Sequence, residues 1–259
     1  VMKLLKKVPV KFISDYNRMI KKTILLTFIC FRFGSAFSQS TPQTDRPDQT
    51  EGVFIIPKNT FQVESGFLID NFNPEARMHF QQNLFKYGIS RRFELQSTVD
   101  FDFNGFGLYP VSLGFKYKIF DEEKILPSIA IIARVPFRKL GSEYLIVQKT
   151  LPMFRIAFEN TLSKKFIVSY NLGMQWQEAE KPSYIFSVSN SYIVSPKLMI
   201  FGEYFNAKTE TQFWNPIVDF GTIISLNNKI ILDFAIGRYF YGNNEFYVTA
   251  GFTKNINFR

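Results

Sequence analysis

Apolar and polar residues alternate one by one along much of the chain beyond about residue 60. The clearest run, residues 93–103, reads Phe-Glu-Leu-Gln-Ser-Thr-Val-Asp-Phe-Asp-Phe, and similar alternation recurs over 111–119, 166–176 and 246–258. Alternation with a period of two is typical of strands whose two faces meet different surroundings. No long stretch repeats apolar residues at helical spacing. The pattern therefore predicts an all-β fold.

Turn signals divide this region into about twelve strands. Short connections such as 90–92, 163–165 and 195–197 alternate with longer ones such as 104–109 and 137–150. An even number of antiparallel strands, with short turns at one end and long loops at the other, is typical of up-and-down barrels of the bacterial outer membrane. We expect strands at roughly 60–69, 78–89, 93–103, 110–119, 127–136, 151–162, 166–176, 184–194, 198–207, 215–226, 229–240 and 246–258.

The same alternation would also suit a soluble β-sandwich or a lipocalin-like barrel, whose apolar face points inward. Three features favour a transmembrane β-barrel: an apparent export signal, an apolar face rich in Phe, and aromatic residues at strand ends. A sheet in lipid must close, because lipid satisfies no backbone hydrogen bond. We expect two aromatic girdles at the membrane interfaces, formed by Trp176, Trp214, Tyr109, Tyr184, Phe93, Phe166 and Phe258.

The positive charge of the chain lies mostly at its N-terminus. Of 31 Lys and Arg residues eight fall within residues 1–38, together with one of the 22 acids, so this part carries +7 of the formal +9. Basic residues, the short apolar run 24–31 and small residues near Ala36 and Ser38 predict a signal peptide over 1–38, with a possible upstream extension before Met19. The alternative is an N-terminal amphipathic helix. The remaining chain carries about +2, so charge gives no reason to expect nucleic-acid binding.

Composition excludes most catalytic and metal chemistry. The chain has one Cys and one His, too few for a disulfide framework or a Cys- or His-rich metal site. His79 is the one possible imidazole base, and it reads better as a polar lumen or rim residue. No nucleophile elbow or glycine-rich phosphate loop is present. We therefore expect no enzyme activity, no catalytic, cofactor-binding or metal residues, and no cofactor.

A short motif follows the proposed cleavage site. It reads Thr-Asp-Arg-Pro-Asp-Gln-Thr-Glu over 44–51, then Pro-Lys at 57–58, then Phe-Gln-Val-Glu-Ser-Gly-Phe over 61–67. This motif resembles the start of the outer-membrane barrel family labelled "MetA-pathway of phenol degradation, putative transporter", in its Bacteroidetes form. The resemblance covers most of 44–258 and implies an outer-membrane pore or transporter. The label does not make phenol the substrate.

Residues 39–59 precede the predicted barrel, 60–259, and carry several charges before the first strand. They are either a polar periplasmic lead-in or a plug that narrows the periplasmic mouth. In a plug, Arg46 would pair with a lumenal acid, for which the candidates are Glu64, Glu94, Asp100 and Asp102. The residues that we expect in the lumen or the plug are Asp45, Arg46, Asp48, Glu51, Glu64, Glu94, Asp100, Asp102, Lys116 and Lys118.

About twelve strands enclose more space than an eight-stranded barrel and less than a sixteen-stranded porin. We therefore expect a narrow, partly occluded channel or transporter that passes small solutes by passive or facilitated diffusion across the cell outer membrane. Its partners would be outer-membrane lipid, an unidentified small solute and the barrel-assembly machinery. The alternatives are a closed structural or interaction barrel of the envelope and, less favoured, a barrel enzyme acting on lipid or peptide.

Overall fold

The computed structural model describes residues 43–70, 77–103, 106–145, 152–176, 182–208, 216–240 and 246–258. The predicted signal peptide, residues 1–38, lies outside these residues, as does Trp214 of the predicted girdle. The side chain of His79 is likewise outside the description.

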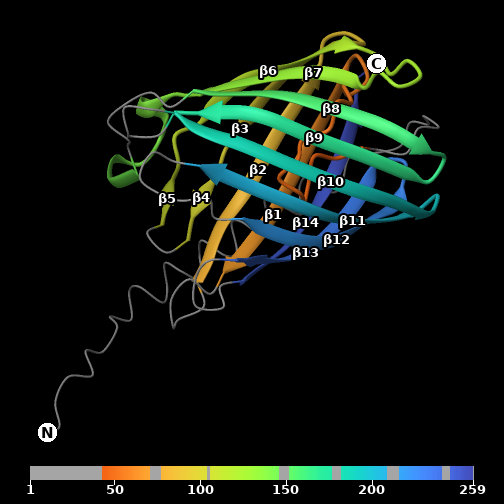
Figure 1. Cartoon of the computed structure of the whole chain (residues 1–259). Helices are drawn as coiled ribbons and strands as arrows, with labels where there is room; N and C mark the ends of the chain where they lie inside the picture. Colours follow the sequence, from red (N-terminus) through yellow and green to blue (C-terminus); the bar gives the residue numbers. More distant parts are fainter. Residues whose placement is uncertain are drawn as a thin grey trace, which may run out of the picture. The chain divides into compact units, whose positions relative to one another are not determined.

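The described chain is built from antiparallel strands, with two short 3-10 helices (η1 and η2) in one loop (Figure 1). No helix among the described residues is long and apolar enough to cross a membrane. The elements are β1 (Thr60–Asp70), β2 (Arg77–Gly88), β3 (Phe93–Thr98), β4 (Phe101–Asp102), β5 (Gly107–Leu108), β6 (Ser112–Phe120), β7 (Ser128–Pro136), η1 (Arg138–Leu140), η2 (Glu143–Leu145), β8 (Met153–Ser163), β9 (Phe166–Gln175), β10 (Ser183–Ser195), β11 (Leu198–Lys208), β12 (Ile217–Asn227), β13 (Ile230–Tyr239) and β14 (Phe246–Asn257).

The sheet closes into a ring because β1 pairs with β2 on one side and with β14 on the other. Each remaining long strand pairs with its neighbours in sequence order. The two-residue strands β4 and β5 form a small hairpin that extends β3 and β6. When each is counted with the strand that it extends, the ring has twelve strands, which we call staves. The prediction of a closed antiparallel barrel of twelve strands is confirmed.

The third stave differs from the continuous strand expected over 93–103, because β3 ends at Thr98 and β4 begins at Phe101. Between them the backbone N–H of Val99 donates to the carbonyl of Asn83. The Asp100 carboxylate accepts the backbone N–H of Asn83 at 3.0 Å, in place of a backbone carbonyl. A polar side chain thus interrupts the ladder without leaving the Asn83 donor unsatisfied.

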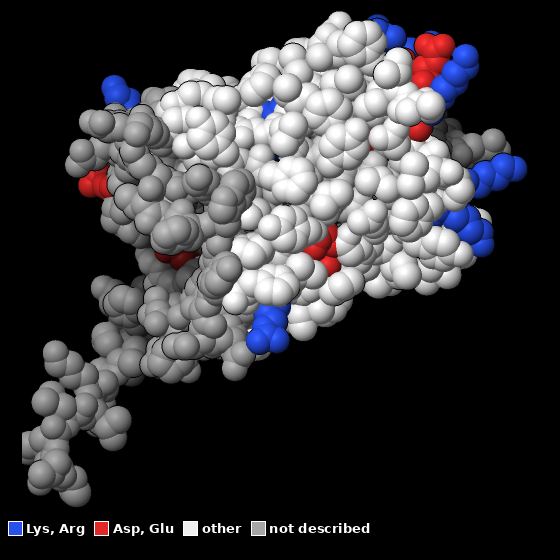
Figure 2. Space-filling model, viewed as in Figure 1, with Lys and Arg blue, Asp and Glu red and all other residues white. Residues whose placement is uncertain are grey.

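The outer surface of the barrel is apolar. Along β13 exposure alternates strictly, with Leu232, Phe234 and Ile236 exposed and the residues between them buried. Among the described residues, large exposed apolar side chains recur on every long strand except β2, and include Phe67, Leu113, Phe154, Leu172, Phe186, Ile200, Phe220 and Phe246. Figure 2 shows this wall as largely uncharged in that view, with Lys, Arg, Asp and Glu gathered at the end formed by the short turns. Such a band suits the hydrocarbon interior of a bilayer.

The inner surface of the barrel is mixed and contains buried charges. The fully buried side chains include Lys86, Lys116, Glu64, Glu94 and Asp219. Two apolar patches interrupt them. One holds Val53, Ala130, Ile132, Met153 and Ala157, and the other Phe201, Ile223, Ile231 and Ala235. The inside of this barrel is therefore where buried polar groups need partners.

Candidate functional site

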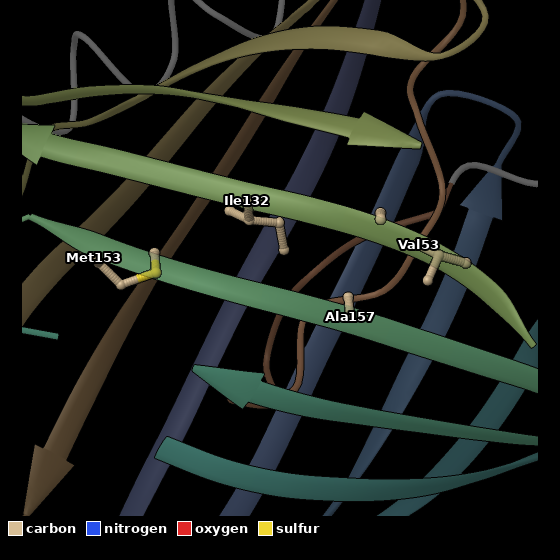
Figure 3. Packing of buried hydrophobic residues seen from close by; sticks show 5 residues of the cluster. Val53, Ile132, Met153 and Ala157 are labelled. Atoms are coloured by element: carbon tan, nitrogen blue, oxygen red, sulfur yellow. The ribbon is translucent and has the colours of Figure 1, made fainter. Parts of the chain in front are cut away.

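Residues 43–57, which we call the lumenal segment, lie inside the ring, where the red-orange part of the chain runs in Figure 1. Backbone N–H groups of the segment donate to side chains on distant staves, such as Ile56 to Glu94 and Gln49 to Glu203, both at 2.8 Å. Val53 of the segment belongs to one apolar cluster with Ile132 of β7 and Ala157 of β8 (Figure 3). The segment is thus bonded to the inner wall at many points around the barrel.

The side of the lumen formed by β2, β6, β7 and β8 carries four cationic side chains, and we call it the basic wall. Its members are Lys86, Lys116, Arg134 and Arg155. The side formed by β11, β12 and β13 carries Glu203, Asp219 and Asp233, and we call it the acidic wall. In the ring of twelve staves β6 and β12 are opposite one another. The lumenal segment lies against both.

Asp45 of the segment binds the first two cations of the basic wall. One carboxylate oxygen lies 2.5 Å from the Lys86 ammonium and 2.8 Å from that of Lys116, and the other accepts the backbone N–H of Gly52 at 2.9 Å. Burial alone would raise the pKa of Asp45, but the charges of Lys116 and Lys86 outweigh it and hold the pKa far below its usual value. Asp45 is therefore ionised in the folded protein.

The two ammonium groups also lie over the ring of Phe54. The Lys86 and Lys116 nitrogens are 4.8 and 4.9 Å from the ring centroid. A cation over an aromatic face is attracted by the ring quadrupole, more strongly where water is excluded. Lys86 completes its contacts with Glu64 at 2.5 Å, so both buried lysines are compensated.

Glu51 binds the other two cations of the basic wall. Its oxygens lie 2.9 and 2.5 Å from the two terminal nitrogens of Arg134, and 3.4 Å from Arg155. Its backbone N–H donates to the side-chain oxygen of Asn171 at 2.8 Å, and the Asn171 amide donates back to the Glu51 carbonyl at 2.9 Å. Burial opposes ionisation, but Arg134 and Arg155 lower the pKa of Glu51.

Arg46 reaches the opposite side. Its guanidinium donates to Asp233 at 3.3 Å, to Thr249 at 2.8 Å and to Gln82 at 3.3 Å. A cross-strand pair of glycines, Gly66 and Gly251, leaves the space that it occupies. A Cβ at either position would collide with Arg46, at 2.6 Å from its Nε in the case of Gly251. The barrel wall therefore has a notch shaped for this one side chain.

The remaining polar groups of the segment meet the carboxylates of β11 and β12. Thr50 donates its hydroxyl to Glu203, and Tyr247 of β14 donates to Asp219. Loss of hydration and the nearby charges of Glu203 and Asp219 raise the pKa of Asp48 well above its usual value. One oxygen of Asp233 and the hydroxyl of Ser187 are buried with no hydrogen-bond partner in the described part of the chain. Nε of Arg155 on the basic wall also has no partner among the described residues, so the two walls differ in their number of ion pairs with the segment rather than in unpaired atoms.

A cavity of about 250 Å³ lies beside the segment at the short-turn end, lined by β8 to β12. Its polar lining includes serine hydroxyls and carboxylates, and also threonine, glutamine and lysine side chains: Ser169, Ser191, Ser195, Ser225, Glu159, Asp48, Thr44, Thr50, Gln43 and Lys197. Such a lining offers donors and acceptors to a small polar solute. Among the described residues, no group of three or more His, Cys, Asp or Glu is placed to hold a metal ion.

The structure corrects one predicted pairing. Arg46 pairs with Asp233, and none of the four acids proposed for it is its partner. Glu64 binds Lys86, and Glu94 accepts the backbone N–H of Ile56. Asp100 and Asp102 lie on the interrupted third stave, where Asp100 binds backbone. Alternation predicts which face of the sheet each of these acids occupies, but not which side chains meet across the lumen.

The other predicted lumen and plug residues divide into two groups. Asp45, Asp48, Glu51 and Lys116 come together in the contacts described above. Lys118 does not join them, because it pairs with Asp121 of the following turn at 2.8 Å, near the rim. Lys118 lies in the same alternation on β6 as Lys116, but two residues nearer the short turn that follows the strand.

The predicted lumen and plug residues do not include Lys86, Arg134, Arg155, Asn171, Glu203, Asp219 or Asp233. Alternation along β13 could have found Asp233, because it shares a face with the small residues Ala235 and Gly237. Arg134 gave a weaker signal, because it ends an apolar run of β7 in which both faces are apolar.

The described girdle residues lie near the two ends of the staves. Tyr184 is near the start of β10, Trp176 follows β9, and Tyr109 precedes β6, all at the long-loop end. Phe93 and Phe166 begin β3 and β9, and Phe258 follows β14, all at the short-turn end. Phe93 stacks on Phe115 at 5.7 Å between centroids. Their role at the membrane interfaces stays a prediction.

The barrel is similar to solved outer-membrane channels. The KdgM porin in complex with disordered oligogalacturonate has a TM-score of 0.60 and 10% sequence identity, covering 76% of this chain and 99% of that one. The COG4313 outer membrane channel from Pseudomonas putida F1 has a TM-score of 0.57 and 13% identity, covering 79% and 98%. At such identities the likeness shows the fold, which is that of outer-membrane porins.

Comparison with curated proteins gave no match. A family model described as "Putative MetA-pathway of phenol degradation" matches residues 44–258, which begin in the lumenal segment and end after β14.

Proposed function

This chain belongs to the MetA-pathway of phenol degradation family, and from that premise we propose that it is an outer-membrane channel passing small solutes by passive or facilitated diffusion. The supporting observation is the contrast between the two surfaces of one closed ring. The exterior is apolar, and the interior carries buried charges and hydroxyls. A scaffold without transport has no need of charged side chains that each require a partner. The family description assigns no solute to this chain.

We further propose that residues 39–59 are a plug rather than a lead-in. The lumenal segment contacts opposite walls of the ring, through Asp45 and Glu51 on one side and Arg46 on the other. A solute would enter through the serine-lined cavity at the short-turn end. Because the segment lies across the remaining lumen, solute passage requires it to shift.

The test is single-channel recording from the purified full chain in planar lipid bilayers. We expect discrete conductance steps, and a larger conductance when residues 40–52 are deleted. Recordings without steps, from protein that shows a heat-dependent gel shift, would favour the closed structural barrel instead. Unchanged conductance and selectivity after the deletion would show that the segment is no plug. Outer-membrane fractionation of expressing cells should recover the protein, and a freely soluble product would contradict the membrane location.

The proposal includes the route of the chain to the membrane. Residues 1–38 would direct export and be removed, and the barrel-assembly machinery would insert the strands. Mass spectrometry of the mature protein tests the first point. An N-terminus at Gln39 is expected, and retention of residues 1–38 in the membrane fraction would contradict it.

A further inference from the structure

The Glu51 carboxylate lies in a pocket that belongs to the barrel wall. Arg134 and Arg155 come from the neighbouring staves β7 and β8 and contact the Glu51 carboxylate, whereas Asn171 of β9 exchanges hydrogen bonds with the Glu51 backbone. Gln96 of β3 accepts from Arg134 at 2.9 Å and 2.6 Å and thereby orients its guanidinium. The cationic groups of the pocket therefore come from the wall, and the lumenal segment supplies the Glu51 carboxylate and the Gln49 carbonyl, which accepts from Arg155 at 2.9 Å.

That occupant is a carboxylate bound through both oxygens. Two parallel N–H to oxygen contacts between a guanidinium and a carboxylate give the geometry that best distinguishes this anion from a point charge. Among the ion pairs of the described residues, Glu51 is the one carboxylate partner of Arg134 and Arg155. Asp45, in contrast, binds lysines, one of which keeps Glu64 as a second partner.

Removing Glu51 from this pocket has a cost. Both arginine side chains are nearly buried, at 13% and 12% relative exposure, and a buried cation that loses its partner is strongly destabilising. A solute that takes the place of the segment lowers this cost if it brings a carboxylate of its own. A neutral solute of the same size does not.

We propose that Arg134 and Arg155 form a binding site for the carboxylate of a small organic acid, and that Glu51 is a tethered competitor for that site. The link to solute passage rests on the proposed channel function, whereas the binding site does not. A short tether gives a competing group an effective concentration in the millimolar range. Free carboxylate therefore has to exceed that range to displace Glu51 in the native chain.

The experiment is calorimetric titration of the detergent-solubilised full chain with succinate, using uncharged succinamide as the matched probe. In Glu51→Gln the competitor is neutralised while its size is kept, and we expect succinate affinity to rise at least about tenfold. Adding Arg155→Gln to that variant should lower the affinity by about tenfold or more. Succinamide should not bind to any of these proteins.

Control variants lie outside the pocket. Arg92→Gln and Glu123→Gln change exposed residues at the short-turn rim and should leave succinate affinity within about twofold of the unmodified chain. A heat-dependent gel shift confirms folding of each variant. Should Glu51→Gln fail to fold, Glu51→Asp retains the charge on a shorter side chain and should show a smaller rise in affinity.

Equal succinate affinity in the native chain and the folded Glu51 variant would overturn the proposal, as would affinity that survives Arg155→Gln. Equal binding of succinamide would also overturn it, because charge would then play no part. Conductance is recorded separately in potassium chloride. Conductance steps without tighter succinate binding leave the channel standing and remove the carboxylate site. Tighter succinate binding without conductance steps supports the carboxylate site and contradicts the channel function.

Discussion

The basic and acidic walls lie opposite one another in the ring and hold the same segment in different ways. On the basic wall each carboxylate of the segment contacts two cations, Asp45 with Lys86 and Lys116, and Glu51 with Arg134 and Arg155. On the acidic wall one cation, Arg46, meets Asp233, and the other contacts are single hydrogen bonds from Gln49 and Thr50 to Glu203.

This difference indicates which contacts of the lumenal segment break first when it moves. Charges shared among several buried partners are costly to separate, whereas a single hydrogen bond contributes about 1 kcal/mol net. The cavity also lies against β8 to β12, where the acidic wall begins. We therefore expect the contacts of the segment with the acidic wall to open before those with the basic wall.

The largest effect should come from Asp45→Asn. This change leaves Lys86 and Lys116 with one carboxylate fewer inside the lumen, and we expect a loss of about 3 kcal/mol of folding free energy. The midpoint of heat-induced gel mobility change measures it. Asp121→Asn is the matched control, because Asp121 also binds two cations, Arg92 and Lys118, but on the exposed rim. There the expected loss is at most about 1 kcal/mol, and equal losses would contradict the comparison.

Gly66→Ala should have the next largest effect. The added methyl group collides with the Arg46 guanidinium and separates it from Asp233, and we expect a loss of about 2 kcal/mol. The double variant with Arg46→Ala provides the test. If the collision is the cause, Gly66→Ala adds almost nothing once Arg46 is gone. A full additional loss in that background would place the strain in the β1–β14 backbone instead.

The two walls should respond to pH with opposite signs. Asp45 and Glu51 have lowered pKa values, so their attraction to the basic wall is present above the ordinary values of 3.8 and 4.5 and is lost in stronger acid. Asp48 has a raised pKa, so its neutral form suits the folded arrangement, and its ionisation on raising the pH adds a charge that the nearby carboxylates Glu203 and Asp219 repel.

Channel-opening frequency in bilayers measures this pH response. We expect it to increase as the pH rises through the raised pKa of Asp48, and this increase should be absent in Asp48→Asn. An increase that persists in Asp48→Asn would assign the response to another group. Glu51→Asn cannot replace Asp48→Asn in this experiment, because it also removes the carboxylate that Arg134 and Arg155 bind.

Thr50→Val should have the smallest effect. It removes the hydroxyl donor to Glu203 while keeping the side-chain shape, and we expect a loss of about 1 kcal/mol. Thr222→Val, on the outward face of β12, serves as the control and should change stability less. A loss from Thr50→Val as large as that from Asp45→Asn would remove the distinction between the two walls.

Alternation predicted most of the barrel because period two states which face a residue occupies. It assigned Glu64, Glu94 and Lys116 to the polar face and Phe246 to the apolar one, as the structure has them. It did not predict that Arg46 meets Asp233, 187 residues away. That contact depends on the closure of the ring and on the height of each residue within it, neither of which a single strand encodes.

The arginine pocket escaped prediction for a related reason. Along β7 the inward residues Ala130 and Ile132 are as apolar as their outward neighbours, because they pack on Val53 of the segment. Alternation fades where the lumen is filled by protein rather than water. The position of Arg134 depends on its register with Gly114 of β6 and with Met153 of β8, and alternation does not specify register.

The pairing of β1 with β14 is the pairing that closes the ring of strands. The lumenal segment runs directly into β1, and β1 finds its second neighbour only when β14 arrives. Until then the ring is open along that seam, and residues 43–57 can settle against the walls from the side. Joining the seam then encloses the segment, so it need never be threaded through a finished barrel. The pair of strands that closes the ring thus also encloses the lumenal segment.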